Sequence, residues 1–159
     1  MTLKEKIIQE SLRLFSTKGF AGTSISEILE AAETSKGGLY NHFRTKEELL
    51  SDVLRESRRI LREKNLAGLD EIEEPLGKVE RLLLNYRGRY WKDSGNLPGG
   101  CIFDRVSVEA TEMGDQWPHL AEEIDEGFSR LRSMLKNYLD QAKEDGQLRD
   151  EANTEDVAD

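Results

Sequence analysis

One short stretch of the chain concentrates side chains suited to binding phosphate oxygens. Residues 35–43 read SKGGLYNHF. Lys36 supplies a cation, and Tyr40 and His42 can each donate a hydrogen bond to a phosphate. Ser35 can cap a short helix over residues 36–43. These residue types in one segment predict a surface that contacts a phosphate backbone.

Two adjacent glycines, Gly37 and Gly38, lie inside this predicted helix. A glycine in a helix interior costs about 1 kcal/mol relative to alanine. One interpretation is that the backbone must approach a groove floor with no side chain between. The other is that both glycines lie in the first turn, where the cost is smaller, and merely ease the start of the helix. The first interpretation is favoured.

Hydroxyl side chains mark the starts of the neighbouring helices. Ser24 and Thr45 each stand three residues before a glutamate, which is the spacing of a capping box. Thr23 precedes the first of these helices, and Lys46 opens the second. Free backbone N–H groups at helix starts bind phosphates, so these positions extend the predicted contact surface.

The elements that must position these side chains are helices. Apolar residues follow a helical stripe from Leu3 to Phe15, and Lys18 and Gly19 provide a stop. A second short helix opens at Ser24, the third covers 36–43, and a long fourth begins after Thr45. A tight turn joins the second and third helices. This is helix-turn-helix geometry, in which the third helix enters the major groove of DNA.

The remaining sequence is also helical, with no alternating pattern long enough for a sheet. We expect a break over 68–74, a helix opened by Pro75, a loop over 93–100, and helices over 101–113 and 117–143. Gly146 should stop the last of these, and residues 156–159 resemble the start of another. The predicted fold class is all-α.

The net charge of −9 is distributed unevenly. Residues 1–48 contain seven Lys or Arg and seven Asp or Glu, so the whole negative excess lies in 49–159. Repulsion between this acidic part and DNA would orient the neutral part toward the phosphates. No apolar run approaches the ~20 residues of a membrane helix, and the N-terminus does not resemble a signal peptide. With Cys101 as the single cysteine, no intrachain disulfide is possible, and we expect a cytoplasmic protein with no membrane association.

Three blocks, at 23–28 (TSISEI), 35–43 and 46–50 (KEELL), resemble in order and spacing the signature of the tetracycline-repressor (TetR) family of bacterial transcription regulators. The resemblance covers roughly residues 3–55. It implies a helix-turn-helix DNA-binding domain at 1–45. At 46–159 it implies an antiparallel helical domain for effector binding and dimerisation, incomplete at its C-terminus because the usual interface helices would follow.

The resemblance also implies a function and a set of contacts. The function is a ligand-responsive regulator, a homodimeric repressor released from a palindromic double-stranded DNA operator by a small effector. Lys36, Tyr40, His42 and Lys46 would contact phosphates, with Thr23 and Ser24 assisting. Residues nearest the bases would be Gly37, Gly38 and Asn41, and Ser35 completes the set of DNA-binding residues.

Two positions depart from the family pattern. Leu29 stands where the family usually has alanine, and Glu33 stands where it has glycine, in the turn. A residue other than glycine at positive φ costs on the order of 1 kcal/mol. Either the turn is rebuilt or Glu33 is strained, and its charge lies close to the DNA face.

By analogy with the family, residues 70–145 should enclose an effector pocket. Its candidate lining residues are Tyr86, Tyr90, Cys101, Phe103, Arg105, Trp117 and Phe128. The alternative is that most of them are packing residues. Cys101 should begin a helix, whose dipole would lower the thiol pKa and suit an oxidant sensor. A small buried side chain is the more common role for such a cysteine.

Two other functions compete with this reading. An enzyme could use Cys101 with His119 and a carboxylate, although two histidines and one cysteine are little material for a triad or metal site. An interaction module could keep the fold without binding DNA. We assign no catalytic residue, metal or cofactor. The effector, the operator, the regulated genes and the sign of regulation stay open.

Overall fold

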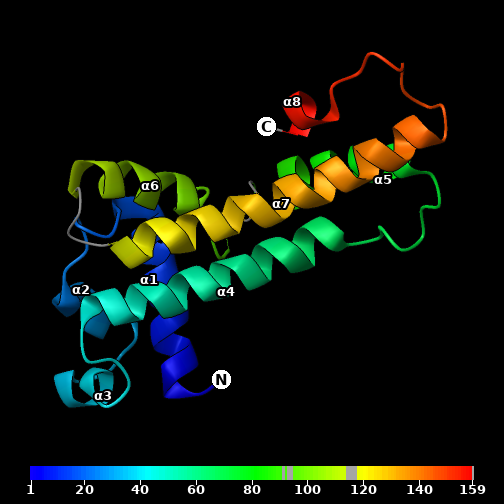
Figure 1. Ribbon diagram of the computed structural model, residues 1–159. Helices are drawn as coiled ribbons and strands as arrows, with labels where there is room; N and C mark the ends of the chain where they lie inside the picture. The colour runs from blue at the N-terminus through cyan, green and yellow to red at the C-terminus, as the bar shows by residue number, and fades with distance from the viewer. Residues whose placement is uncertain (91, 93–94, 114–117, 159) are drawn as a thin grey trace.

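The computed structural model describes residues 1–90, 92, 95–113 and 118–158, and in these ranges it is entirely helical (Figure 1). The helices, in chain order, are α1 (Leu3–Lys18), α2 (Ile25–Ala31), α3 (Lys36–Tyr40), α4 (Lys46–Leu66), α5 (Pro75–Asn85), the π-helix η1 (Tyr86–Tyr90), α6 (Ile102–Met113), α7 (Pro118–Glu144) and α8 (Thr154–Ala158). The expected all-α fold is confirmed.

The start of α1 is fixed by a capping box. The Thr2 hydroxyl accepts a hydrogen bond from the Glu5 N–H at 3.2 Å, and the Glu5 carboxylate accepts one from the Thr2 N–H at 2.7 Å. Gly19 ends the helix at a φ of 82°, a conformation that side chains disfavour. The buried side of α1 carries Ile7 and Phe15, both with no exposed surface.

The three short helices and the start of α4 share one set of buried residues. Ile28 on α2, Leu39 on α3 and Leu49 on α4 are each at most 1% exposed. Because α3 has only five residues, Leu39 and the following Phe43 determine how it sits on the core. The predicted third helix reached residue 43, whereas the observed one ends at Tyr40 and continues as a turn.

Helix α4 begins at the end of the molecule that carries α2 and α3 and runs toward the end that carries α5 (Figure 1). Figure 1 shows α7 lying beside it and pointing in the same direction, while α5 and α6 run back against α7. Helices α5 and α6 are therefore both antiparallel to α4 and α7. Gly146, at a φ of 70°, follows the end of α7 as the sequence predicts.

The buried core is continuous from α1 to α7. One cluster includes Phe15 from α1, Val53 from α4, Phe103 and Val106 from α6, and Ile124 from α7. The first helices and the body are thus packed on one hydrophobic core, with no interruption at residue 45.

The π-helix η1 was not predicted, because its residues continue the apolar spacing of α5. In the structure, Asn85 just before it donates from its amide to the carbonyls of Asn65 and Ala67, at 2.9 and 2.8 Å. Tyr90 at its end is fully buried. The wider turn allows both residues to face inward, which a regular α-helix with 3.6 residues per turn would not. Within the described residues, none of the helices has the length and apolarity that crossing a membrane requires.

Candidate nucleic-acid interface

Helix α3 lies on the outside of the molecule, anchored by two side chains. Leu39 and Phe43 are each 1% exposed, and both belong to the core cluster. On the opposite side, Lys36, Asn41 and His42 are exposed, and Tyr40 is 48% exposed. The alternation of anchor and exposed residues turns this face of α3 toward solvent.

The two glycines of α3 differ in their surroundings. A Cβ at Gly37 would meet only the Ser35 hydroxyl, at 3.8 Å, so the space beside it is open. A Cβ at Gly38 would overlap the Thr34 hydroxyl and lie 3.5 Å from Leu3 Cδ2. An alanine at Gly38 would therefore require the Thr34 side chain to rotate away. An alanine at Gly37 would require no rearrangement within the protein, so its backbone is accessible to a partner.

The first turn of α3 is held by its own N-cap. The Ser35 hydroxyl accepts a hydrogen bond from the Gly38 N–H at 3.1 Å. No hydrogen bond or ion pair among the described residues engages the Lys36 ammonium. Lys36 is thus an exposed cation at the start of the outward helix, where the positive end of the helix dipole adds to its charge.

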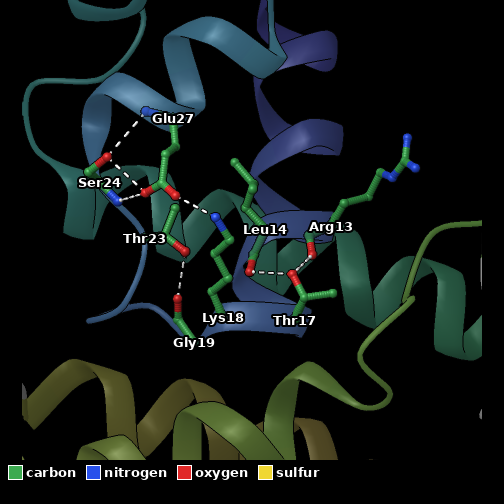
Figure 2. Close-up of polar contacts among 8 residues, drawn as sticks. All are labelled: Arg13, Leu14, Thr17, Lys18, Gly19, Thr23, Ser24 and Glu27. Atoms are coloured by element: carbon green, nitrogen blue, oxygen red, sulfur yellow. Dashed lines mark hydrogen bonds and ion pairs between the residues drawn. The ribbon is translucent and has the colours of Figure 1, made fainter.

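At the start of α2, Ser24 uses its polar atoms for capping (Figure 2). Its hydroxyl accepts from the Glu27 N–H at 3.2 Å, and its N–H donates to the Glu27 carboxylate at 2.8 Å. Lys18 on α1 pairs with the same carboxylate at 2.5 Å. The hydrogen bond from Lys18 and those from Ser24 lower the pKa of Glu27 to about 2.

Thr23 differs from the sequence-based expectation. Its side chain is 1% exposed, and its hydroxyl donates to the Gly19 carbonyl at 2.7 Å (Figure 2). Its backbone N–H donates to the Phe20 carbonyl at 3.2 Å. Both donors of Thr23 are used to close the turn between α1 and α2, so it offers neither to a ligand here.

Lys46 also differs from the expectation. Its ammonium donates to the Phe20 carbonyl at 2.5 Å and lies 4.2 Å from the centre of the Phe20 ring. Partial burial lowers the pKa of Lys46. The side chain is folded back onto the turn after α1, where it ties α4 to α1 instead of pointing outward.

Glu33 adopts a φ of +52° in the turn between α2 and α3. Among the described residues it is the one non-glycine position with positive φ. Its carboxylate forms an ion pair with the ammonium of Lys6 on α1, and that hydrogen bond lowers the pKa of Glu33. The turn is therefore not rebuilt; Glu33 occupies the left-handed conformation, and Lys6 offsets its charge. Leu29, the other departure, is partly buried against the core.

One residue close to this region could not be found from the sequence. Glu109 on α6 accepts hydrogen bonds from the Phe20 N–H at 3.0 Å and the Ala21 N–H at 2.9 Å. It lies nearly ninety residues away along the chain. A lone glutamate on a helix carries no sequence signal for such a contact, which depends on how α6 packs against the α1–α2 turn.

The residues predicted to line an effector pocket mostly serve as packing. Tyr90 and Phe103 are at most 1% exposed and belong to the core. Tyr86 is stacked on Tyr90 with ring centres 5.6 Å apart, and burial raises its pKa to about 12. Phe128 is 41% exposed, and its ring packs edge-on against Phe103 at 5.9 Å.

The other described candidates for the pocket, Cys101 and Arg105, differ in burial. The Tyr90 hydroxyl lies 3.5 Å from Cys101 Sγ, and burial raises the pKa of the Cys101 thiol. This is opposite to the lowered value expected at a helix start, because desolvation of the thiolate outweighs the local donors. Arg105 is exposed. Trp117 and the His119 side chain lie outside the described residues.

Two family models match the chain. "Bacterial regulatory proteins, tetR family" matches residues 7–53, and "Tetracyclin repressor-like, C-terminal domain" matches residues 75–159. Together they cover both the helix-turn-helix end and the helical body.

Known regulators are similar to the chain over different lengths. An HTH-type transcriptional regulator of the lacX 3′ region of Lactococcus lactis subsp. lactis is 36% identical over 138 residues, covering 86% of this chain and 67% of that protein. The regulator YerO of Bacillus subtilis is 55% identical over 47 residues, or 30% of this chain. The chain spans less than two thirds of several such relatives, 16% in the case of YerO.

A solved structure shows the same architecture. A TetR transcriptional regulator from Chloroflexus aurantiacus superposes with a TM-score of 0.84 at 27% identity, covering 98% of this chain and 76% of that one. The helical arrangement described above is therefore that of this regulator.

Proposed function

The chain belongs to the tetR family of bacterial regulatory proteins, and on that basis we propose that it is a ligand-responsive DNA-binding transcriptional repressor. The observation that carries this proposal is the outward face of α3. Lys36, Tyr40, Asn41 and His42 are exposed there together while Leu39 anchors the helix from behind. This arrangement supports insertion of α3 into a major groove.

The contacts divide by chemistry. Lys36, Tyr40 and His42 bind phosphate oxygens, with Ser24 and Ser35 presenting the N-termini of α2 and α3 to the backbone. Gly37 and Asn41 lie nearest the bases. Thr23 and Lys46 support the interface from inside, because their donors are bonded to the α1–α2 turn. The backbone of Gly38 lies beside the Thr34 hydroxyl, which a larger residue would displace.

Regulation requires two states of the body that present α3 differently. In a homodimer, two copies of α3 would occupy successive major grooves of a palindromic operator. An effector changes the balance only by its difference in affinity for the two states. Residues 46–159 form the effector-binding and dimerising part, and residues 1–45 form the DNA-binding part.

A direct contact joins these two parts. The Glu109 carboxylate on α6 binds two consecutive backbone N–H groups of the α1–α2 turn, so movement of α6 acts on the turn that precedes α2. Lys46 reaches the Phe20 carbonyl of the same turn from α4. The α1–α2 turn thus receives contacts from both α4 and α6.

The test is DNA binding with and without Lys36. Fluorescence anisotropy would measure affinity for the promoter DNA beside the protein's own gene over a range of salt concentrations. Lys36→Ala should weaken binding to all sequences and reduce the magnitude of the salt slope by about one unit, since one phosphate contact is lost.

Lys92→Ala, which removes an exposed lysine remote from α3, is the matched control and should leave the slope unchanged. If Lys36→Ala instead relaxed the preference at one base pair, the phosphate role of Lys36 would be wrong. Failure of the wild-type protein to bind this DNA, or any duplex, would favour an interaction module with the same fold.

A further inference from the structure

A cavity of about 270 Å³ lies between α4 and α7, away from the residues predicted to line a pocket. Leu61 and Leu66 from α4 and Leu131 and Met134 from α7 form its apolar walls, and all four are partly buried. The two helices lie side by side here (Figure 1). The volume is close to the lower end of the range for small-molecule sites, about 300–1,000 Å³.

Asn65 lines this cavity with an unsatisfied side chain. It is 1% exposed, and among the described residues neither its Oδ1 nor its Nδ2 has a hydrogen-bond partner. Its backbone carbonyl is satisfied by the Asn85 amide at 2.9 Å, so the deficit is confined to the carboxamide. A buried donor and acceptor left unpaired are strongly destabilising, and asparagine is also a poor helix former. A ligand group that accepts from and donates to Asn65 would remove this cost.

Cations outnumber carboxylates at the same cavity, whose lining has three arginines and one glutamate, Glu126. Arg58 and Arg130 are bonded to carboxylates of α7: Arg58 to Glu123 at 3.3 Å, and Arg130 to Glu126. Arg62 is exposed and lines the cavity, and within the described part of the chain no hydrogen bond or ion pair engages its guanidinium. In a chain of net charge −9, an uncompensated arginine beside an apolar cavity favours a carboxylate, which it can bind through two hydrogen bonds.

From these three observations we infer that the cavity between α4 and α7 binds an amphipathic carboxylic acid. Its apolar body lies against the leucines and Met134, a hydroxyl donates to and accepts from the Asn65 carboxamide, and its carboxylate binds Arg62. This inference rests on the proposed function, because it identifies the site and chemical class of the effector.

A second cavity, of about 630 Å³ between α1 and α4, is less suited to such a ligand. Its lining includes Glu5, Glu56 and Glu63, and Arg59 beside it is already paired with Glu56 and Glu63 at 2.8 Å. Three carboxylates at this wall repel an anion, whereas the cavity between α4 and α7 has one, that of Glu126.

The experiment uses three eight-carbon probes that differ in one group each. Calorimetry without DNA would compare 3-hydroxyoctanoate with octanoate, which lacks the hydroxyl, and with 1,3-octanediol, which lacks the carboxylate. We expect 3-hydroxyoctanoate to bind most tightly and each of the other two to bind at least about tenfold more weakly, because a lost hydrogen bond to a charged or buried group has that effect.

Two variants assign the contacts. Arg62→Gln should reduce binding of 3-hydroxyoctanoate to the level of the diol and leave diol binding unchanged. Asn65→Leu should abolish the preference for the hydroxylated acid over octanoate, and should raise the melting temperature by about 2–4 °C as the unpaired groups are removed. Arg59→Gln, which removes an arginine on another face of α4, is the control and should bind all three probes as the wild type does.

The inference is overturned if the acid and the diol bind equally, if no probe binds, or if both Arg62→Gln and Asn65→Leu bind as the wild type does. Because these measurements contain no DNA, they are independent of the operator experiment. A protein that binds the acid but no DNA would retain the site and lose the proposed function.

Discussion

Gly37 is the residue whose substitution best separates folding from DNA binding. Gly37→Ala adds a methyl group to open space, and alanine in place of glycine favours the helix by up to about 1 kcal/mol. In the complex the same methyl would stand between the backbone and the bases. We expect unchanged or raised stability and an affinity at least about tenfold lower, since a disturbed base-pair contact costs about 1–3 kcal/mol.

Chemical denaturation and anisotropy on the same samples would measure both quantities. Gly88→Ala is the matched control, because a Cβ at Gly88 on η1 meets none of the described atoms within 4 Å and η1 packs against α4 and α5. An affinity unchanged by Gly37→Ala would remove Gly37 from the interface.

Glu33 combines backbone strain with an ion pair, and two substitutions separate them. Glu33→Ala keeps the strain at φ +52° and loses the pair with Lys6, so stability should fall only slightly, because an exposed ion pair contributes little. Glu33→Gly also loses the pair but relieves the strain, which is worth about 1–2 kcal/mol. Urea unfolding should therefore rank Glu33→Gly above Glu33→Ala. The reverse order would mean that the turn carries no strain.

Glu27 gives the capping of α2 a defined pH dependence. Its pKa is lowered from 4.5 to about 2 by Lys18 and Ser24. A lowered pKa in the folded state means that the ionised carboxylate stabilises the fold above pH 4.5, and that this contribution is lost as the pH falls toward 2. The stability difference between wild type and Glu27→Gln should be constant near neutral pH and should shrink across this interval. Glu30→Gln, on the same helix, is the comparison, and an equal pH dependence for both variants would contradict the assignment.

At the scale of helices, the local signals in the sequence predicted most boundaries. As predicted, the hydroxyls of Ser24, Ser35 and Thr45 cap α2, α3 and α4. Gly19 and Gly146 follow the ends of α1 and α7, also as predicted. These features depend on a few neighbouring residues and can therefore be predicted from the sequence. The π-helix at 86–90 could not be predicted, because it is associated with a contact from Asn85 to a carbonyl some twenty residues away.

The residues of the candidate interface and of the expected pocket could be predicted where their positions depend on local sequence, and not where they depend on packing between distant segments. The exposed face of α3 follows from local periodicity around Leu39 and Phe43, and the structure exposes it. The inward positions of Thr23 and Lys46 depend on the geometry of the α1–α2 turn. The aromatic residues of the body could be assigned to core or pocket only once the helices were packed.

The contact between α6 and the α1–α2 turn gives a prediction at this scale. Glu109→Gln keeps the size of the side chain but removes the charge that two N–H groups share. Hydrogen exchange at Phe20 and Ala21 should become about tenfold faster, because a hydrogen bond to a charged group contributes about 1.5–3 kcal/mol. Asp104→Asn, an equivalent charge change on the same helix, should leave both amides protected. Equal exchange in the two variants would show that Glu109 does not hold the turn.

At the scale of the whole molecule, the charges are distributed unevenly, which favours one orientation in the proposed complex with DNA. The negative excess lies in residues 49–159, and the outward face of α3 belongs to the neutral segment 1–48. Composition alone predicts this asymmetry. It does not predict that one core joins the two segments, from Phe15 to Ile124, which only the packed structure reveals.

Helix α4 is a single uninterrupted rod of 21 residues, which at about 1.5 Å per residue is roughly 30 Å long. A tilt of α4 about one end displaces its other end in proportion to its length. A tilt of about 5° moves the other end by roughly 2–3 Å. Major grooves on one side of a duplex recur about every 34 Å, or about 10 base pairs. If the two copies in the proposed homodimer tilt in opposite directions, the distance between their α3 helices departs from this spacing by twice the displacement of one. In the proposed homodimer, a ligand in the cavity beside Leu66 that tilted α4 by this amount would move both copies of α3 out of register with the grooves.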